Sequence, residues 1–503
     1  PHYHAEDGIR DGIVRLVGSE MCIRDRVRSV EFGTLTASEV EENLAPIENT
    51  RLLNPSQMRN RFLVDQGEVA GLVIDDLDVD RYELDGEMQQ VLIGARELDL
   101  GGVTNRSWQG LHLINTRGCG LVLAPTGQVL SNQRPNYQQL ELERPELYFS
   151  PQLSGYAIAR TESSERVCEE AHTYEGTSGV AMNNIARRAA FALAFLDYNV
   201  LGSGAVNSDS QMLWVRGVND RLEKLAPFLS YDADPYPVQL DGRVVWIVDA
   251  YTTSTKVPYG QRIGDVQRSP ASGLGDNDNY VRNSVKAVVD GYTGEVTFYV
   301  VDPEDPIIRA WGSAFPDLLT PLEEMPETLR GHLRYPEDLF RIQTDVYSKY
   351  RIDAALFFQR DGNAWSVAQA PGTEPTQRGV ANTVTPTGPA EAPTAAEDTF
   401  ATESDALRFT PYYTMFDTSQ EDEQMNEEFV ILRPFVPFST GDERTQLQAY
   451  MTASSDPGSY GELTTYIVDD SENALPDGPI RVAGNAESQP EISQRISLDN
   501  QGE

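Results

Sequence analysis

The amino-acid sequence predicts an α+β fold in which antiparallel β-hairpins and sheet pack against helices. Three stretches combine strand-forming residues with a short turn sequence, which is typical of β-hairpins. Segments with helical periodicity lie between groups of strands rather than after each single strand. The lack of a regular βαβ alternation favours α+β over a doubly wound parallel sheet.

Each predicted hairpin places a turn-forming pair between two runs of strand-forming residues. Aspartate and glycine supply the positive φ angles that such turns need. The three hairpins and their turns are Val79–Leu100 (Asp85-Gly86), Pro235–Thr253 (Asp241-Gly242) and Val285–Asp302 (near Thr293-Gly294).

Three segments predict helices. Asn183–Leu201 has helical periodicity and is rich in Ala and Leu. Asp305–Phe315 begins with Asp-Pro, an N-cap residue followed by proline at the first helical position. Tyr335–Arg351 carries Pro336 and two acids in its first turn, where acids complement the helix dipole.

The run Val244–Val248 (VVWIV) is apolar at every position. A strand with one face in water carries polar residues at every second position, so this one should be covered on both faces. We therefore expect a central strand, paired on both edges, with Trp246 buried and Asp249 at its end. The helix over Asn183–Leu201 is expected to cover one face.

Composition changes at residues 370–406, which are rich in Pro, Thr, Ala and acids and poor in large apolar residues. Such a segment cannot bury a core, so we expect a disordered linker. It separates a main region, 27–369, from a β-rich C-terminal segment, 407–503, which we expect to be truncated. Four strands are expected there, within Pro411–Asp417, Glu427–Phe438, Leu447–Ser455 and Gly461–Asp470.

Residues 11–26 read DGIVRLVGSEMCIRDR, which resembles translated sequencing-adapter sequence. We therefore interpret residues 1–26 as an assembly artefact and exclude them from fold reasoning. The exclusion removes the apparent metal-binding tract at His2 and His4 and the thiol of Cys22.

The chain is strongly acidic, with 40 basic and 78 acidic residues and a net charge of −38. Such a surface repels phosphate backbones, which argues against nucleic-acid binding. The most apolar run of the chain, Ala189–Leu196, is far shorter than the roughly 20 residues that span a bilayer as a helix.

Three long blocks of the sequence are distinctive, at residues 234–261, 279–316 and 332–351. Shorter blocks accompany them, among them TRLLNPSQ, LDVDRYELDGE, AVNSDSQMLW and SSDPGSYGEL. All of these blocks closely resemble those of an uncharacterised bacterial family, protein family 0182, and stand in the family's order.

The resemblance implies a multi-pass membrane protein, with about seven N-terminal transmembrane helices followed by a large extracytoplasmic region. This chain resembles that region alone, so its own transmembrane part is an expected partner and the cell membrane its expected location. The family brings no activity, cofactor or catalytic residue, so the catalytic residues stay unknown.

The stretch from Asp234 to Gln261 raises the question of an active site. Two carboxylates about 5–10 Å apart serve glycoside hydrolysis. The structural interpretation is favoured, because Asp241 belongs to a turn and Asp249 ends an apolar run. The candidate residues are Asp232, Asp234, Asp241, Asp249, Tyr251, Thr252 and Thr253.

Residues 275–283 (GDNDNYVRN) alternate oxygen-bearing side chains, as calcium loops do, and make Asp276 and Asp278 weak candidate ligands for calcium. The loop lacks the glycine and the distal glutamate of an EF-hand. A solvated loop is the favoured interpretation.

Cys119 and Cys168 fit no zinc-binding spacing. They either form one disulfide, if the region is extracytoplasmic, or are two unrelated buried thiols, and the second interpretation is favoured. His112 lies in a strand-like stretch and His332 precedes a helix. No segment matches a nucleophile elbow, so a serine-hydrolase mechanism is disfavoured.

The sequence thus favours an extracytoplasmic, non-enzymatic module that binds or interacts in the bacterial envelope or supports transport. The segment VDGYTGEV (289–296) is similar to the hairpin of PepSY-type binding modules. The alternative is an enzyme that acts on cell-wall polymer or lipid through carboxylates around Asp234–Asp249.

Overall fold

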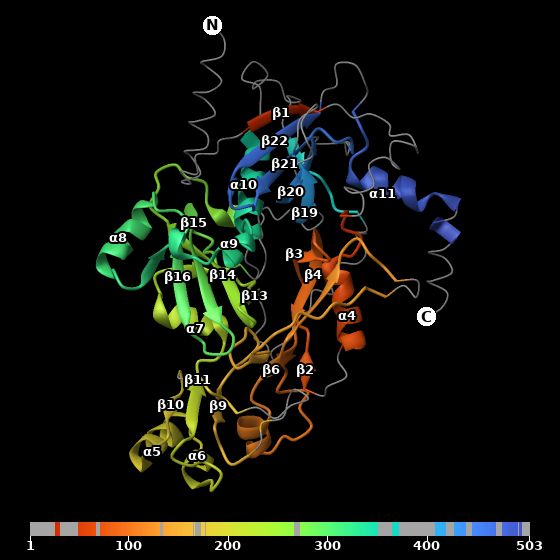
Figure 1. The fold of residues 1–503 in the computed structure, drawn as a ribbon. Helices are drawn as coiled ribbons and strands as arrows, with labels where there is room; N and C mark the ends of the chain where they lie inside the picture. Colours follow the sequence, from red (N-terminus) through yellow and green to blue (C-terminus); the bar gives the residue numbers. More distant parts are fainter. Residues whose placement is uncertain are drawn as a thin grey trace, which may run out of the picture.

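The computed structural model of the chain contains several sheets stacked along one long axis (Figure 1). It describes residues 26–30, 49–66, 71–130, 134–163, 165, 173–176, 178–265, 272–350, 365–371, 408–418, 427–438, 445–468, 475–490 and 492–494. The expected linker at 370–406 and the expected artefact at 1–26 lie almost wholly outside these residues. Arg26 is the first residue of a strand.

The middle of the molecule is a six-stranded sheet, called here the central sheet, in which β14 pairs with β12 and β13 on one edge and with β15 on the other. The sheet continues through β15 to β16 and β17. Its strands are β12 (Ser230–Tyr231), β13 (Tyr236–Leu240), β14 (Arg243–Ser254), β15 (Tyr280–Asp290), β16 (Val296–Val300) and β17 (Leu319–Pro321).

Both faces of β14 are covered, as its apolar run predicts. On one face Trp246, only 2% exposed, packs in a cluster with buried residues of α7 (Val218–Leu225) and α8 (Pro306–Ala314). On the other face, Val245 and Ile247 pack with a cluster that includes α9 (Glu327–Gly331). The prediction of a central strand is confirmed.

The helix predicted over Asn183–Leu201 is wrong in extent and in position. The structure has two helices, α5 (Ile185–Ala194) and α6 (Asn199–Gly202). They separate at Leu196, whose φ is 53°, and Asp197 then accepts the N–H of Asn199 at 2.9 Å, which starts α6. These helices pack on a small sheet and not on β14.

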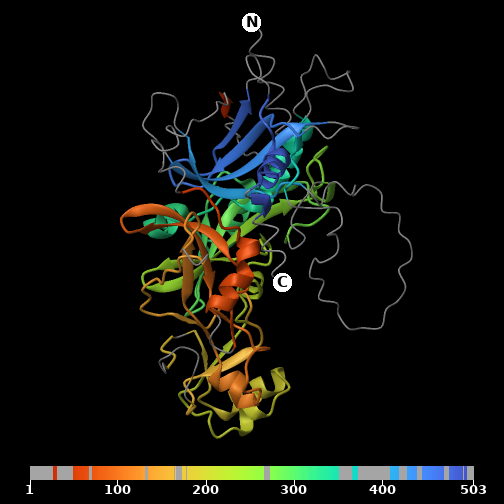
Figure 2. The same cartoon turned by 90° about the vertical axis from the view of Figure 1, so that its right-hand side faces the viewer.

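We call α5, α6 and this small sheet the tip lobe, because it forms one end of the molecule (Figures 1 and 2). Its strands lie in the order β10-β11-β9. They are β9 (Tyr156–Ala159), β10 (Val180–Ala181) and β11 (Gln211–Trp214).

The N-terminal sheet, β3-β4-β7, is covered by α4 (Pro55–Gln66), which buries Phe62. The two strands of its predicted hairpin meet at Asp85 and Gly86, both with positive φ. The strands and the adjoining short pairs are β3 (Asp78–Leu84), β4 (Glu87–Ala95), β7 (Leu121–Pro125), β2 (Leu72–Val73) with β5 (Glu97–Leu98), and β6 (Gly118–Cys119) with β8 (Glu146–Leu147).

The far end from the tip lobe is a C-terminal sheet in the order β1-β22-β21-β20-β18, with β19 also paired to β20 (Figure 2). Helix α10 (Glu337–Tyr350) packs against it, and α11 (Pro479–Glu487) follows it in the chain. All four predicted C-terminal strands are present. The strands are β1 (Arg26–Val30), β18 (Trp365–Val367), β19 (Tyr412–Asp417), β20 (Glu427–Pro437), β21 (Ala449–Ser454) and β22 (Leu463–Val468).

The C-terminal segment therefore shares its sheet with β1 and β18, which come from the predicted main region. The predicted fold class, α+β, is confirmed. Of the helices in the described part of the chain, none is long and apolar enough to cross a membrane.

Candidate functional site

Asp249 lies inside β14 and not at its end, which corrects the expectation from sequence. It is the cross-strand partner of Lys286 on β15, and the two buried side chains form an ion pair. The Lys286 ammonium also donates to the carbonyl oxygen of Arg334 at 2.6 Å. Burial lowers the pKa of Lys286 against the opposing effect of Asp249. The Asp249 carboxylate therefore makes a structural contact.

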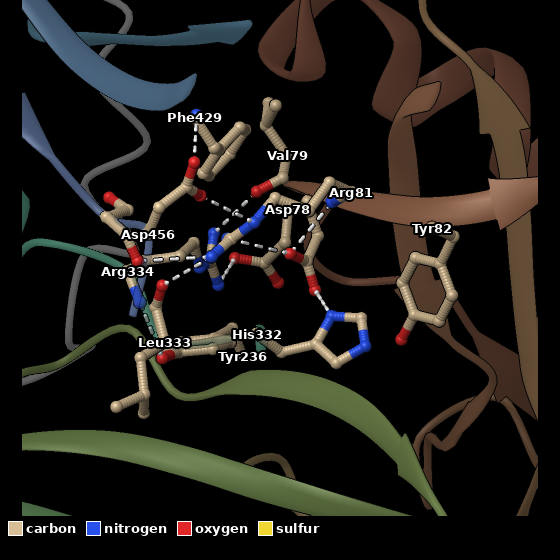
Figure 3. A network of polar contacts seen from close by, with 12 residues as sticks. Asp78, Val79, Arg81, Tyr82, Tyr236, His332, Leu333, Arg334, Phe429 and Asp456 are labelled. Carbon is tan, nitrogen blue, oxygen red and sulfur yellow. Dashed lines mark hydrogen bonds and ion pairs between the residues drawn. The ribbon is translucent and has the colours of Figure 1, made fainter. Parts of the chain in front are cut away.

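Arg334, between α9 and α10, connects the central sheet to the N-terminal sheet (Figure 3). Its guanidinium donates to the Asp78 carboxylate at 2.7 Å and to the Val79 carbonyl at 3.2 Å, both on β3. The same guanidinium lies 3.6 Å from the ring centroid of Tyr236 on β13. Arginine suits such a site because its planar group can stack and donate several hydrogen bonds at once.

Arg81 on β3 connects the N-terminal sheet to the C-terminal sheet (Figure 3). Its guanidinium donates to the carbonyl of Ser455 at 3.1 Å, lies 3.4 Å from the Asp456 carboxylate, and stands over the ring of Phe429. Ser455 and Asp456 directly follow β21. The Arg81 side chain on β3 therefore contacts the end of β21, which is distant in sequence.

Asp80, the residue before Arg81, accepts a hydrogen bond from His332 with a distance of 2.9 Å to Nδ1 (Figure 3). Burial favours the neutral acid, but His332 and Arg81 outweigh it and hold the pKa of Asp80 below its usual value. Asp80 is therefore an anion in the interior.

We call this set of contacts the buried ionic junction, since it joins all three large sheets. Such pairs add little net stability against apolar replacements but are costly to break singly. We expect their main effect to be the selection of one arrangement of the sheets. The junction consists of Asp78, Asp80, Arg81, Asp249, Lys286, His332, Arg334 and Asp456.

Beside the junction lies an acid pair, Asp76 and Asp234, whose side chains are hydrogen-bonded to each other. Burial, and then the neighbouring acids, raise the pKa of Asp234 to about 8 and that of Asp76 to about 6. Both residues keep exposed surface, and water there reduces the size of the shifts but not their direction. Burial and the neighbouring carboxylates thus favour protonation of this pair.

Asp232 is a third acid of this group. Burial raises its pKa to about 8, with the nearby carboxylates of Asp338 and Asp249 adding to the effect. Tyr251 on β14 donates its hydroxyl to Asp232 at 2.7 Å. Three acids with neutral-range pKa values thus come from two loops, one before β3 and one between β12 and β13.

The geometry of the acid pair decides between mechanisms. Glycoside hydrolysis needs two carboxyl groups about 5–10 Å apart, with room for sugar or water between them. Asp76 and Asp234 are in hydrogen-bond contact, which matches instead a dyad that shares a proton, as in acid-catalysed attack by water. The pair therefore fits removal of a proton from a bound water by the ionised member of the pair.

The predicted site residues divide into two groups. Asp241 is in the exposed hairpin turn with φ 48°, and Thr252 donates its hydroxyl to Asp305, the N-cap of α8, at 2.5 Å. With Asp249 these are structural. Asp232 and Asp234 are the members that gather beside other acids.

Sequence reasoning missed Asp76, Arg334 and the role of His332. The sequence did contain one signal for the buried ion pair. Lys286 is one of only four lysines in the chain, and it interrupts an apolar strand. A buried lysine requires a buried acid. Which acid it meets depends on strand register, which the sequence does not state.

The calcium candidates lie in a loop in which both aspartates accept hydrogen bonds from main-chain N–H groups. Asp276 is exposed, and its carbonyl accepts the N–H of Gly264 at 2.9 Å. The Asp278 carboxylate accepts the N–H of Gly275 at 3.0 Å. Within the described residues, no group of three or more His, Cys, Asp or Glu side chains is placed to hold a metal ion. Calcium binding stays a prediction.

Two other sequence expectations are corrected. His112 lies in a short π-helix, Gly110–Ile114, and not in a strand, and its ring stacks on Tyr156 with Nδ1 2.9 Å from that residue's carbonyl. Cys119 is disulfide-bonded, which contradicts the favoured interpretation of an unrelated buried thiol. Cys168 lies outside the described residues.

The fold and the site define the class of the protein: an α+β protein of several sheets, which are joined by buried ion pairs and have a close pair of acids, Asp76 and Asp234, beside them. The sequence profile described as uncharacterised protein family UPF0182 matches residues 24–499, and the chain belongs to this family.

Similar proteins from several organisms carry the name UPF0182 protein. The chain is 32% identical to one from Desulforamulus reducens over 499 residues, 95% of this chain and 48% of that protein. It is 32% identical to one from Methanospirillum hungatei (93% and 49%) and 34% identical to one from Cupriavidus necator (93% and 48%). The chain therefore spans about half the length of these relatives. No solved structure matches it.

Proposed function

We propose that this chain is the extracytoplasmic region of a longer, multi-pass envelope protein, and that it serves there as a binding or transport-supporting module. The observation that carries the proposal is the disulfide at Cys119. Disulfides persist in oxidising compartments and are rare in the cytosol. The family resemblance and the half-length match to relatives support the same placement.

A binding role is favoured over catalysis by how the charges are used. Lys286, Arg334 and Asp80 each bind a group of opposite charge or a main-chain carbonyl of another element. Charges used in this way hold sheets together and are not available to a substrate. A rigid module of this kind presents surfaces to partners.

The compartment is tested in cells that produce a full-length protein containing this chain. Free thiols are alkylated in intact cells, the protein is reduced, and newly exposed thiols are labelled with a heavy maleimide. We expect Cys119 to be labelled only after reduction, with Cys119→Ser as the control that loses the shift. A thiol at Cys119 that alkylates before reduction contradicts the proposal.

A second candidate function, hydrolysis of cell-wall polymer or lipid, is favoured by one observation, the hydrogen-bonded pair Asp76–Asp234. In this mechanism one carboxylate takes a proton from water while the other, protonated, donates to the substrate oxygen. The test compares Asp234→Asn with Asp241→Asn on purified peptidoglycan and on phospholipid. Hydrolysis that only Asp234→Asn abolishes supports the enzyme, and no product from either substrate rejects it.

A further inference from the structure

We infer that the tip lobe is a hinged arm that turns relative to the central sheet, and that Arg216 is the latch that holds it in the position seen in Figure 1. The hinge is the neck of the lobe, which consists of Thr116-Arg117, Tyr148–Ser150 and Val215–Gly217. The first of these segments follows the π-helix Gly110–Ile114, which packs on the lobe, the second precedes β9 and the third follows β11. The inference goes beyond the proposed function, because it applies equally to a binding module and to an enzyme.

The lobe has an apolar core of its own. Its buried residues, among them Phe191, Val200 and Met212, form a cluster separate from those of the central sheet. A smaller cluster, which includes Ala159 and Leu213 of the lobe, lies between the two. The buried ionic junction, which joins the large sheets, has no residue in the lobe. Relative motion is the default for a part with its own core and a small interface.

The interior of the neck is polar. Thr116, Arg117, Glu146 and Tyr148 are all buried in or beside it, and Arg117 donates to the Glu146 carboxylate and to the Tyr148 hydroxyl, both at 3.3 Å. The Glu165 carboxylate accepts the hydroxyl of Thr116 at 3.2 Å. Such contacts bury little apolar area, which is what fixes one part of a protein rigidly on another. The neck therefore holds the lobe mainly by directed hydrogen bonds.

Val215, in the middle of the neck, has a strained backbone. Its φ is 50°, and it is the one β-branched residue with a positive φ in the described part of the chain. The left-handed conformation is costly for valine, because its branched Cβ crowds a carbonyl oxygen. Val215 is in none of the apolar clusters of the described residues, so polar contacts must hold it in this conformation. Strained residues of this kind are found in switch regions.

Arg216 binds all three segments of the neck. Its guanidinium, which is buried, donates from Nε to the carbonyl of Tyr148 at 2.9 Å and from Nη2 to the carbonyl of Thr116. The main-chain carbonyl of Arg216 accepts the N–H of Ser150 at 3.2 Å. Hydrogen bonds from a charged donor are stronger than neutral ones, so this one residue opposes the strain of its neighbour Val215.

Arg221 on α7 holds Val215 from the side of the central sheet. Its Nη1 donates to the Val215 carbonyl at 3.2 Å, and its Nε donates to the carbonyl of Gly294, in the turn between β15 and β16, at 2.5 Å. When the bonds of the two arginines break, Val215 is free to return to a negative φ. A change of that size in one φ redirects the chain between β11 and α7 and turns the lobe, as hinge residues do in domain closure.

The test measures the distance between the lobe and the central sheet in the full chain. Tyr198 on α6 and Ala310 on α8, both exposed, are replaced by p-acetylphenylalanine carrying a nitroxide, and double electron–electron resonance gives the distance distribution. Arg221→Met should enlarge a second population of distances about tenfold, because it frees the Val215 carbonyl. Arg216→Met should enlarge the same population.

A further substitution tests the strain at the neck. Val215→Asn, added to Arg221→Met, should lower the second population about tenfold, because asparagine accepts the left-handed conformation that valine resists. The matched control is Leu196→Asn, added to Arg221→Met in the same way. Leu196 has a similar φ of 53° but lies within the lobe, between α5 and α6, so this change should leave the distribution as it is.

Circular dichroism should show that every variant is folded. If Arg216→Met does not fold, Arg221→Met with and without Val215→Asn decides the question. A single distance that neither arginine variant changes overturns the inference. So does a second population that Val215→Asn lowers no more than Leu196→Asn, since the strain at the neck would then not control the position of the lobe.

Discussion

Lys286 and Asp249 face each other across neighbouring strands in the middle of the central sheet, where Lys286 is fully buried and Asp249 almost fully buried. A charge buried alone is far more costly than a buried pair. The pair therefore acts as a register lock: sliding β15 by one residue would move Lys286 to the other face and leave both charges unpaired.

The first prediction concerns this pair. Asp249→Asn and Lys286→Met should each lower the free energy of unfolding by about 3–5 kcal/mol, because each leaves an uncompensated buried group. The double variant should lose clearly less than the sum of the two. Urea unfolding measures all three. The control is Arg59→Met, which breaks a surface pair with Asp75 and should cost under about 1 kcal/mol. Additive losses contradict the lock.

A second prediction concerns Trp246, which is buried and whose indole donates to the Phe149 carbonyl at 3.1 Å. Trp246→Ala should cost about 3–5 kcal/mol, as other large-to-small core changes do. Tyr198→Ala, an aromatic change at an exposed position, should cost under about 1 kcal/mol. Chemical denaturation followed by circular dichroism distinguishes them. A small loss at Trp246 would make β14 peripheral.

A third prediction concerns pH. The pKa of Asp234 is raised from 3.8 to about 8 in the folded chain, so between these values the folded state holds a proton that the unfolded state has released. Stability from this group is therefore present at low pH and is lost as pH rises toward about 8.

Asp234→Asn should flatten that dependence, because an amide keeps the hydrogen-bond donor at every pH. The unfolding midpoint of the unchanged chain should fall between about pH 5 and pH 8 more steeply than that of Asp234→Asn. Asp241→Asn is the control, since asparagine also accepts the positive φ of this turn. Identical slopes in all three proteins would show that Asp234 does not retain its proton.

A fourth prediction concerns the disulfide of Cys119. Cys119→Ser should lower the free energy of unfolding by about 2–4 kcal/mol, because the unfolded chain is no longer constrained by a closed loop. A reducing agent should lower the stability of the unchanged chain by a similar amount and leave Cys119→Ser unaffected. If the reducing agent destabilises the unchanged chain and Cys119→Ser equally, the loss of stability does not come from the disulfide of Cys119.

A fifth prediction comes from composition. Residues 370–406 should be cut first in limited proteolysis with a protease of broad specificity, because a Pro- and Thr-rich segment buries little apolar surface. Mass spectrometry of the first fragments locates the cut. Early cleavage elsewhere, with this segment intact, contradicts the linker interpretation.

Much of the local structure could be predicted from the sequence, because it depends on neighbouring residues. The turns at Asp85-Gly86 and Asp241-Gly242 formed where Asp-Gly pairs stand, and α8 began at Asp305-Pro306. The central position of β14 followed from an apolar run, since only a strand covered on both faces tolerates one. The strand predicted around His112 was wrong, because a short apolar stretch does not distinguish a strand from a helical turn.

The sequence by itself determined the α+β class, the hairpins, the helices α5, α8 and α10 and the acidic surface, since each follows from residues close together in the chain. Tertiary structure alone decided which distant residues meet: Asp76 with Asp234, Asp78 with Arg334, and Lys286 with Asp249. These contacts depend on strand register and sheet packing, which are set by the burial of the whole core. For the same reason α5 could be predicted as a helix but not placed at the tip, because the apolar face of a helix can cover either sheet.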